Sequence, residues 1–189
     1  MIHEVEDIEL ELHRLSGEPS SQEVPPVMCV FDVVTSGSAE EYATRVRAVL
    51  AAVLALAISE SFDGDDLPVA GFPEWFAGVS GAPAGLVPDF ARLGMERYIE
   101  TVKGGSGGGW QLQEWIYQFD PDSEFRGWAW WDLAQPASRR VRIWVDTWGE
   151  SFFACDELRW LMYTAGGTEV VGPTLVNKSD WLSLRAGRG

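Results

Sequence analysis

Hydrophobic and polar positions alternate along the second half of the chain in a way that predicts strands. The clearest alternation covers residues 140–148, where aliphatic side chains share one side and polar or aromatic side chains share the other. The aliphatic side consists of Val141, Ile143 and Val145. Residues 110–119 and 126–133 have the length and the aromatic, β-branched content of strands. Turn-forming residues separate the three segments, which therefore predict a three-stranded antiparallel meander.

One long helix and one central strand are predicted in the first half of the chain. Ser38 and Glu41 form a capping box before a helix over residues 39–59, whose apolar positions recur at helical spacing. Residues 27–34 are apolar on both sides except for Asp32, a pattern typical of a strand covered from both faces. We therefore expect the helix to close one side of a sheet that contains this strand.

Proline, serine and glycine mark the ends of three further helices. Prolines can open helices over residues 74–79 and 89–102. Ser151 is a suitable N-cap for another helix, which Gly166 would stop. This last helix carries one apolar stripe, and the simplest packing lays the stripe on the aliphatic side of residues 140–148.

The segments near the two ends of the chain are read from weaker patterns. Residues 7–15 alternate with a period of two, so we prefer a strand, although a helix with one apolar face also fits them. Residues 169–176 predict a strand broken at Gly172-Pro173, which indicates a sheet edge or a bulge. A final turn is expected to dock Trp181 onto the body of the protein.

Together these elements predict a single α+β domain over residues 1–189. It contains a mixed, mainly antiparallel sheet of about five to six strands, packed by three to four helices. The length is sufficient to bury roughly 70% of the unfolded surface. The glycine-rich run 104–109 is expected to be a flexible connector inside this domain. Loops are expected at 16–26, 62–67 and 80–87, and a loose tail at 185–189.

Charge and composition narrow the range of partners. The formal net charge of −15 repels nucleic acid and anionic membranes and favours encounter with a basic protein.

The longest apolar run, residues 48–58, is too short to span a bilayer. The N-terminus is acidic where a secretory signal would be basic, so we expect a cytoplasmic protein. Cys29 and Cys155 fit a reducing compartment as buried thiols, while a disulfide between them stays open.

The sequence contains no catalytic signature, and neither a cofactor nor a metal is predicted. A serine or cysteine nucleophile that needs a histidine base would have to use one of the two histidines. His3 lies in the terminus, and His13 lies on the solvent-facing side of a predicted strand. The glycine run lacks phosphate-loop spacing, and the acidic residues at 120–124 lack the rest of a calcium loop. Asp132 and Asp146, with tryptophan neighbours, leave a glycosidase dyad as a minor alternative. Enzymatic activity is therefore undecided, and the sequence favours a protein that is not an enzyme.

Eight of the ten tryptophans lie between residues 110 and 163. Four of them on one sheet face, at about 150–250 Å² each, would exceed the roughly 300–600 Å² of the largest patch on a typical monomer. That face must therefore be covered. The simpler interpretation is that the predicted helices 42–57 and 89–102 cover it, and the alternative is that a partner does. Its mixture of tryptophan, arginine and aspartate resembles the centre of an interface. The predicted partner-binding residues are Trp115, Tyr117, Trp128, Trp130, Asp132, Arg142, Trp144, Asp146 and Trp148.

These observations lead to three functional hypotheses. The first is a soluble, acidic protein-binding module that occludes a basic partner. Toxin-neutralising immunity proteins have such a profile, and the likeness is one of type without a shared motif. The alternative is a small-molecule or carbohydrate binder, or an enzyme, with a tryptophan-lined pocket. The third is a structural component of a larger assembly.

Overall fold

The computed structural model describes residues 3–17, 19, 24–64, 66–82 and 87–186. In these residues it contains seven α-helices, one 3-10 helix and one four-stranded antiparallel sheet. The predicted α+β class is confirmed. The predicted number of strands is too high and that of helices too low, since two segments interpreted as strands are helical. Parts of several predicted irregular segments lie outside the described residues: 16–26, 62–67, 80–87 and 185–189.

The sheet has the strand order β2-β3-β1-β4. Its strands are β1 (Val27–Thr35), β2 (Ala129–Ala137), β3 (Arg140–Asp146) and β4 (Gly167–Asn177). β1 lies between β3 and β4, as expected for the central strand. β4 is an edge strand, and its register against β1 shifts between Val30 and Asp32, opposite the predicted break. A Cβ on Gly172 would lie 2.6 Å from the Val30 carbonyl oxygen, so only glycine fits this close approach of two backbones.

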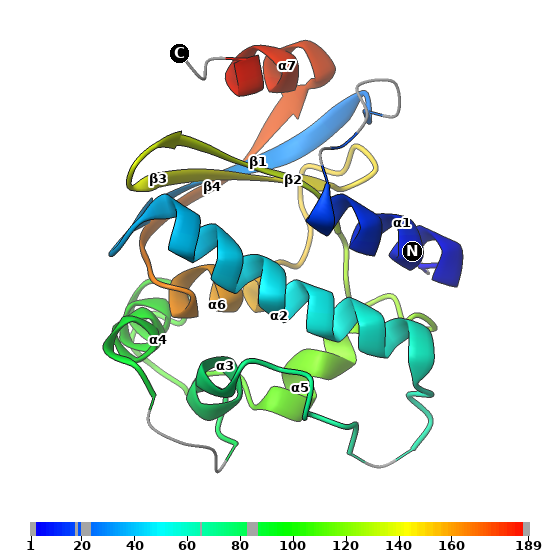
Figure 1. Ribbon diagram of the computed structural model, residues 1–189, viewed down its shortest axis with the longest axis vertical. Helices are drawn as coiled ribbons and strands as arrows, with labels where there is room; N and C mark the ends of the chain where they lie inside the picture. Colours follow the sequence, from blue (N-terminus) through cyan, green and yellow to red (C-terminus); the bar gives the residue numbers. More distant parts are fainter. Residues whose placement is uncertain (1–2, 18, 20–23, 65, 83–86, 187–189) are drawn as a thin grey trace.

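Helices cover the two faces of the sheet unequally (Figure 1). Helices α1, α2 and α6 lie against one face, and α7 lies on the other. Helices α3, α4 and α5 form a further layer beyond α2 and α6. The bounds are α1 Val5–Ser16, α2 Ala39–Ser59, α3 Glu74–Val79, α4 Asp89–Thr101, α5 Leu112–Ile116, α6 Asp156–Thr164 and α7 Lys178–Ala186.

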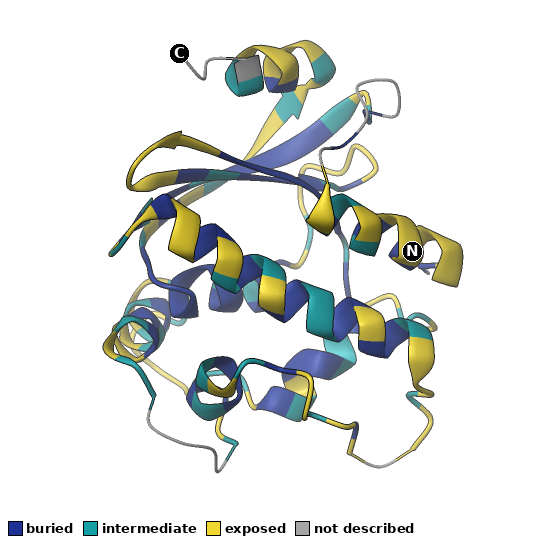
Figure 2. Cartoon of the chain, viewed as in Figure 1, coloured by how far each residue is buried: buried dark blue, intermediate teal, exposed yellow. Residues whose placement is uncertain are grey.

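Helix α2 begins as the capping box predicts, because the Glu41 amide donates to Ser38 Oγ at 3.1 Å. Buried and exposed residues alternate around it (Figure 2). By length and composition α2 is also apolar enough to cross a membrane, a property that core helices share. Its buried residues belong to the main core between the sheet and the helices.

The aliphatic side of β3 faces the main core. Val141, Ile143 and Val145 lie in the same core cluster as Leu158 and Leu161 of α6. This is the arrangement that the apolar stripe of the predicted helix indicates. A smaller cluster lies on the opposite face of the sheet, beneath α7. It includes the docked Trp181, as predicted.

The N-terminal segment 7–15 is helical, so the preferred strand is wrong and the alternative helix is correct. In α1 the buried residues are Ile8, Glu11 and Leu15, whereas Leu10 is 56% exposed. A strand would have placed Leu10 on the same side as Ile8. The spacing 8, 11, 15 is that of one helical face, and it was obscured because one of its members is a buried glutamate.

The segment 110–119 is also helical, and the predicted meander reduces to the hairpin of β2 and β3. Helix α5 and a 3-10 helix, Tyr117–Phe119, replace the expected strand. The buried residues are Leu112, Trp115, Ile116 and Phe119, whose spacing follows a helical face. Their aromatic content suggested a strand, but packing against the core decides the outcome.

Helix α6 begins later than predicted. Ser151 is exposed, and the residue that precedes the first helical turn is Cys155. The irregular segment before Cys155 therefore stays outside the helix, and it contributes to the site described next.

Candidate functional site

The predicted tryptophan face is not exposed as one surface. Trp115, Trp128, Trp130 and Trp144 are fully buried. Trp128 and Trp130 belong to the main core, whereas Trp144 lies in the smaller cluster under α7. The expectation that these side chains share one face is wrong, because the register of β2 against β3 shifts between Trp130 and Asp132. These indoles stabilise the fold from two sides of the sheet.

Two of the predicted polar residues form ion pairs within the protein. Asp132 is buried and accepts a hydrogen bond from Trp181 Nε1 at 3.2 Å, and Arg185 Nε lies 3.4 Å from it. Arg142 Nε donates to Asp32 Oδ1 at 2.8 Å, across the neighbouring strand β1. These contacts hold α7 and the outer face of the sheet in place.

The remaining predicted residues differ in their surroundings. The Tyr117 hydroxyl donates to the Gly64 carbonyl at 3.0 Å. Asp146 Oδ1 accepts the Trp148 amide at 2.9 Å. Trp148 is 41% exposed, which makes it the exposed tryptophan of the predicted set.

Three large aromatic side chains are exposed in the part of the chain that the structure describes, and all three line one hollow. Phe125 is 59% exposed, Trp148 41% and Phe152 95%. The hollow has a volume of about 390 Å³. We call it the aromatic hollow and define it by Glu124, Phe125, Trp148, Glu150, Phe152 and Phe153.

The backbone at Trp148 is in an unusual conformation. Its φ of 53° is the one positive φ at a non-glycine position among the described residues. Such a conformation costs about 1–3 kcal/mol and is concentrated at functional sites. Three contacts hold it. The Asp146 carboxylate accepts the Trp148 amide, the His3 ring packs edge-on with the ring centroids 5.2 Å apart, and the Glu150 amide donates to the Thr147 carbonyl at 3.0 Å in a turn. Trp148 is thus fixed in place before any partner arrives.

A buried ion pair supports the wall of the aromatic hollow next to Phe125. Arg126 Nη1 donates to Glu11 Oε1 at 2.7 Å, and both side chains are almost completely buried. The same Glu11 oxygen accepts the Trp130 amide at 2.6 Å. A buried pair of this kind is costly to break, because either partner alone would be an uncompensated charge. It fixes the segment on which Phe125 lies to α1.

His3 contacts both Trp148 and the segment that carries Phe125 and Arg126. Its Nε2 lies 2.9 Å from the Arg126 carbonyl oxygen, and its ring meets Trp148 edge to face. Burial and the nearby Arg126 guanidinium lower the pKa of His3, which favours the neutral form of the ring. A neutral ring can donate from Nε2 to the carbonyl while Nδ1 faces Arg126 Nη2 at 3.4 Å.

Glu157 lies in the first turn of α6, inside the main core. Its Oε1 accepts Trp128 Nε1 at 2.5 Å, and its carbonyl accepts Trp115 Nε1 at 2.9 Å. Burial raises the pKa of Glu157 to about 7. The side chain connects α6 to the segment that leads into β2.

The rim of the aromatic hollow is acidic. Glu124 and Glu150 are exposed at its edge, and the whole chain carries a net charge of −15. Aromatic rings attract cations through their faces, and carboxylates attract them by charge. The arrangement is therefore suited to a cationic group with an apolar stem. No group of three or more potential metal ligands is found among the residues that the structure describes.

Sequence reasoning missed most of this site. Phe125 lies between predicted elements, Phe152 and Phe153 fall in the first turn of the helix predicted after Ser151, and His3 is expected in a loose terminus, so none of them is predicted to bind a partner. The available signal was the presence of large aromatic residues in polar, turn-rich segments.

No protein-family model matches the chain, and comparison with curated proteins and with solved structures gave no significant match.

Proposed function

We propose that the protein binds a basic partner protein, with a lysine or arginine side chain of the partner entering the aromatic hollow. One observation carries the proposal: the three exposed large aromatic side chains converge on a single hollow that has two glutamates at its rim. The functional class that we favour is a toxin-neutralising, immunity-type protein, which acts by occluding the surface of its partner. The proposal includes a cytoplasmic location, which the free, buried thiols of Cys29 and Cys155 support.

The hollow matches both parts of a long basic side chain. The methylene stem of lysine or arginine packs on apolar rings, here Phe125 and Phe152. Its charged end gains about 0.5–2 kcal/mol over the face of an aromatic ring such as Trp148. Glu124 and Glu150 at the rim add charge-assisted hydrogen bonds. Each part of the hollow therefore contributes to the same ligand.

Preorganisation strengthens this match. Trp148 is held by Asp146 and His3 in the free protein, so little freedom remains to be lost on binding. Exposed aromatic residues at the centre of an interface commonly provide most of the binding energy. The acidic surface around them raises the association rate of a basic partner, and salt screens this effect.

The test starts with the full chain immobilised to capture a partner, which is then purified and titrated calorimetrically. Trp148→Ala should weaken binding by about 30-fold, the effect of losing a hot-spot residue worth about 2 kcal/mol. Leu93→Ala is the matched control, because Leu93 is an exposed apolar residue on α4, outside the hollow. A partner that binds Trp148→Ala as tightly as the parent protein overturns the proposal.

The acidic rim is tested separately by rate measurements at low and high salt. Glu124→Gln combined with Glu150→Gln should slow association and reduce its dependence on salt. The exposed Glu100→Gln is the charge control from α4, and it should leave the rate close to that of the parent. Equal effects of the rim variant and the control would contradict a role of the rim.

A further inference from the structure

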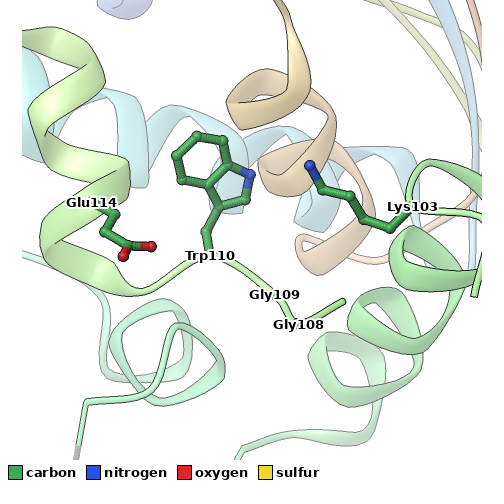
Figure 3. Close-up of a pocket in the computed structure, with 5 residues that line it drawn as sticks. All are labelled: Lys103, Gly108, Gly109, Trp110 and Glu114. Atoms are coloured by element: carbon green, nitrogen blue, oxygen red, sulfur yellow. The ribbon is translucent and has the colours of Figure 1, made fainter. Parts of the chain in front are cut away.

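A second hollow lies between the end of α4 and the start of α5. It is lined by Lys103, Gly108, Gly109, Trp110 and Glu114 and has a volume of about 230 Å³. Figure 3 shows the Trp110 ring standing between the side chains of Glu114 and Lys103. This indole, flanked by an acceptor and a donor, does not belong to the aromatic hollow.

The polar groups around this hollow are held in position. Trp110 Nε1 donates to the Tyr98 hydroxyl at 3.0 Å, which fixes the orientation of the indole. Lys103 Nζ donates to Asp156 Oδ2 at 3.0 Å and lies 5.8 Å from the Tyr98 ring centroid. Burial by itself lowers the pKa of Lys103, but the Asp156 carboxylate reverses this and raises the pKa overall. The lysine is therefore a fixed, charged donor.

The glycines form the backbone side of the hollow. A Cβ on Gly109 would lie 2.3 Å from the Trp160 ring, so glycine allows the chain to pass directly over that indole. A Cβ on Gly108 would meet nothing within 4 Å, because this position faces open space. The last part of the glycine run is thus packed at Gly109 and open at Gly108.

We propose that this hollow binds a neutral carbohydrate ring. The C–H groups of a sugar can pack on the Trp110 ring, while its hydroxyls donate to Glu114 and accept from Lys103. Glu114 and Lys103 are the charged side chains that line the hollow, and their opposite charges leave it without a net charge, which suits a neutral ligand. The volume lies below the roughly 300–1,000 Å³ of pockets for drug-sized ligands, which limits the ligand to about one ring.

The site is tested by NMR titration of the ¹⁵N-labelled full chain with glucose, galactose, mannose and N-acetylglucosamine, each taken to about 100 mM. The Trp110 Nε1–H signal is assigned from its absence in Trp110→Phe. It should shift saturably with at least one of these sugars. Absence of any saturable shift of this signal overturns the proposal.

Three variants separate this site from the rest of the protein. Glu114→Gln should weaken sugar binding at least about fivefold, since a charged acceptor is replaced by a neutral one. Glu100→Gln, an exposed control on α4, should bind as the parent does. Trp148→Ala should also leave sugar binding unchanged, so the fate of this inference is independent of the aromatic hollow. Equal affinities of Glu114→Gln and the parent would overturn the assignment, and the remaining indole signals show whether the variant is folded.

Discussion

The buried carboxyl group of Glu157 should make the stability of the protein depend on pH. Burial raises its pKa from the ordinary 4.5 to about 7. The folded pKa is above the unfolded one, so the stability from this group is complete below about pH 4.5 and is lost as the pH rises through about 7. At about 1.4 kcal/mol for each pH unit, the loss amounts to about 3 kcal/mol in the free energy of unfolding.

Replacing Glu157 by glutamine removes the titration and keeps an oxygen that can accept the Trp128 N–H. The free energy of unfolding of Glu157→Gln, relative to the parent protein, should therefore rise by about 3 kcal/mol between about pH 4.5 and pH 8. Urea unfolding followed by tryptophan fluorescence measures it at each pH. Glu100→Gln, an exposed control, should show no such trend. A constant difference between Glu157→Gln and the parent at all pH values would refute the reasoning.

Three further predictions concern packing and strain. Gly94→Ala should lower the free energy of unfolding by about 1–3 kcal/mol, because its Cβ would lie 2.0 Å from the Tyr163 carbonyl oxygen, whereas Gly108→Ala has open space; urea unfolding compares the two. Trp148→Gly should be about 1 kcal/mol more stable than Trp148→Ala in thermal unfolding, since glycine accepts the positive φ. Trp181→Ala should release α7 from the sheet, seen as faster hydrogen exchange in that helix and not in α2. Equal stabilities within either pair, or unchanged exchange, would contradict these predictions.

The sequence predicted the elements whose periodicity is unambiguous. The capping box at Ser38, the two-sided apolar pattern of β1 and the alternation of β3 each specify one structure. The segments 7–15 and 110–119 fit two periods, and burial against the rest of the protein decided between them. Local pattern could not supply this information, because it does not include tertiary contacts such as that between Glu11 and Arg126.

The site was harder to predict than the fold for a related reason. Trp144 and Trp148 lie on one strand and its immediate extension, yet one is fully buried and the other is exposed. Which tryptophans are covered depends on the register shift in β2 and on the docking of α7, and neither leaves a signal in the periodicity. Tryptophan content therefore identified the region, while exposure in three dimensions identified the residues.

The proposed partner contacts the exposed aromatic side chains of the aromatic hollow and not the buried indoles. The most direct measurement is an NMR titration of the ¹⁵N-labelled protein with the purified basic partner, following the indole N–H signals. We expect the Trp148 signal to shift or broaden saturably, while those of Trp128 and Trp144 stay in place. A titration in which Trp128 and Trp144 respond and Trp148 does not would contradict the account.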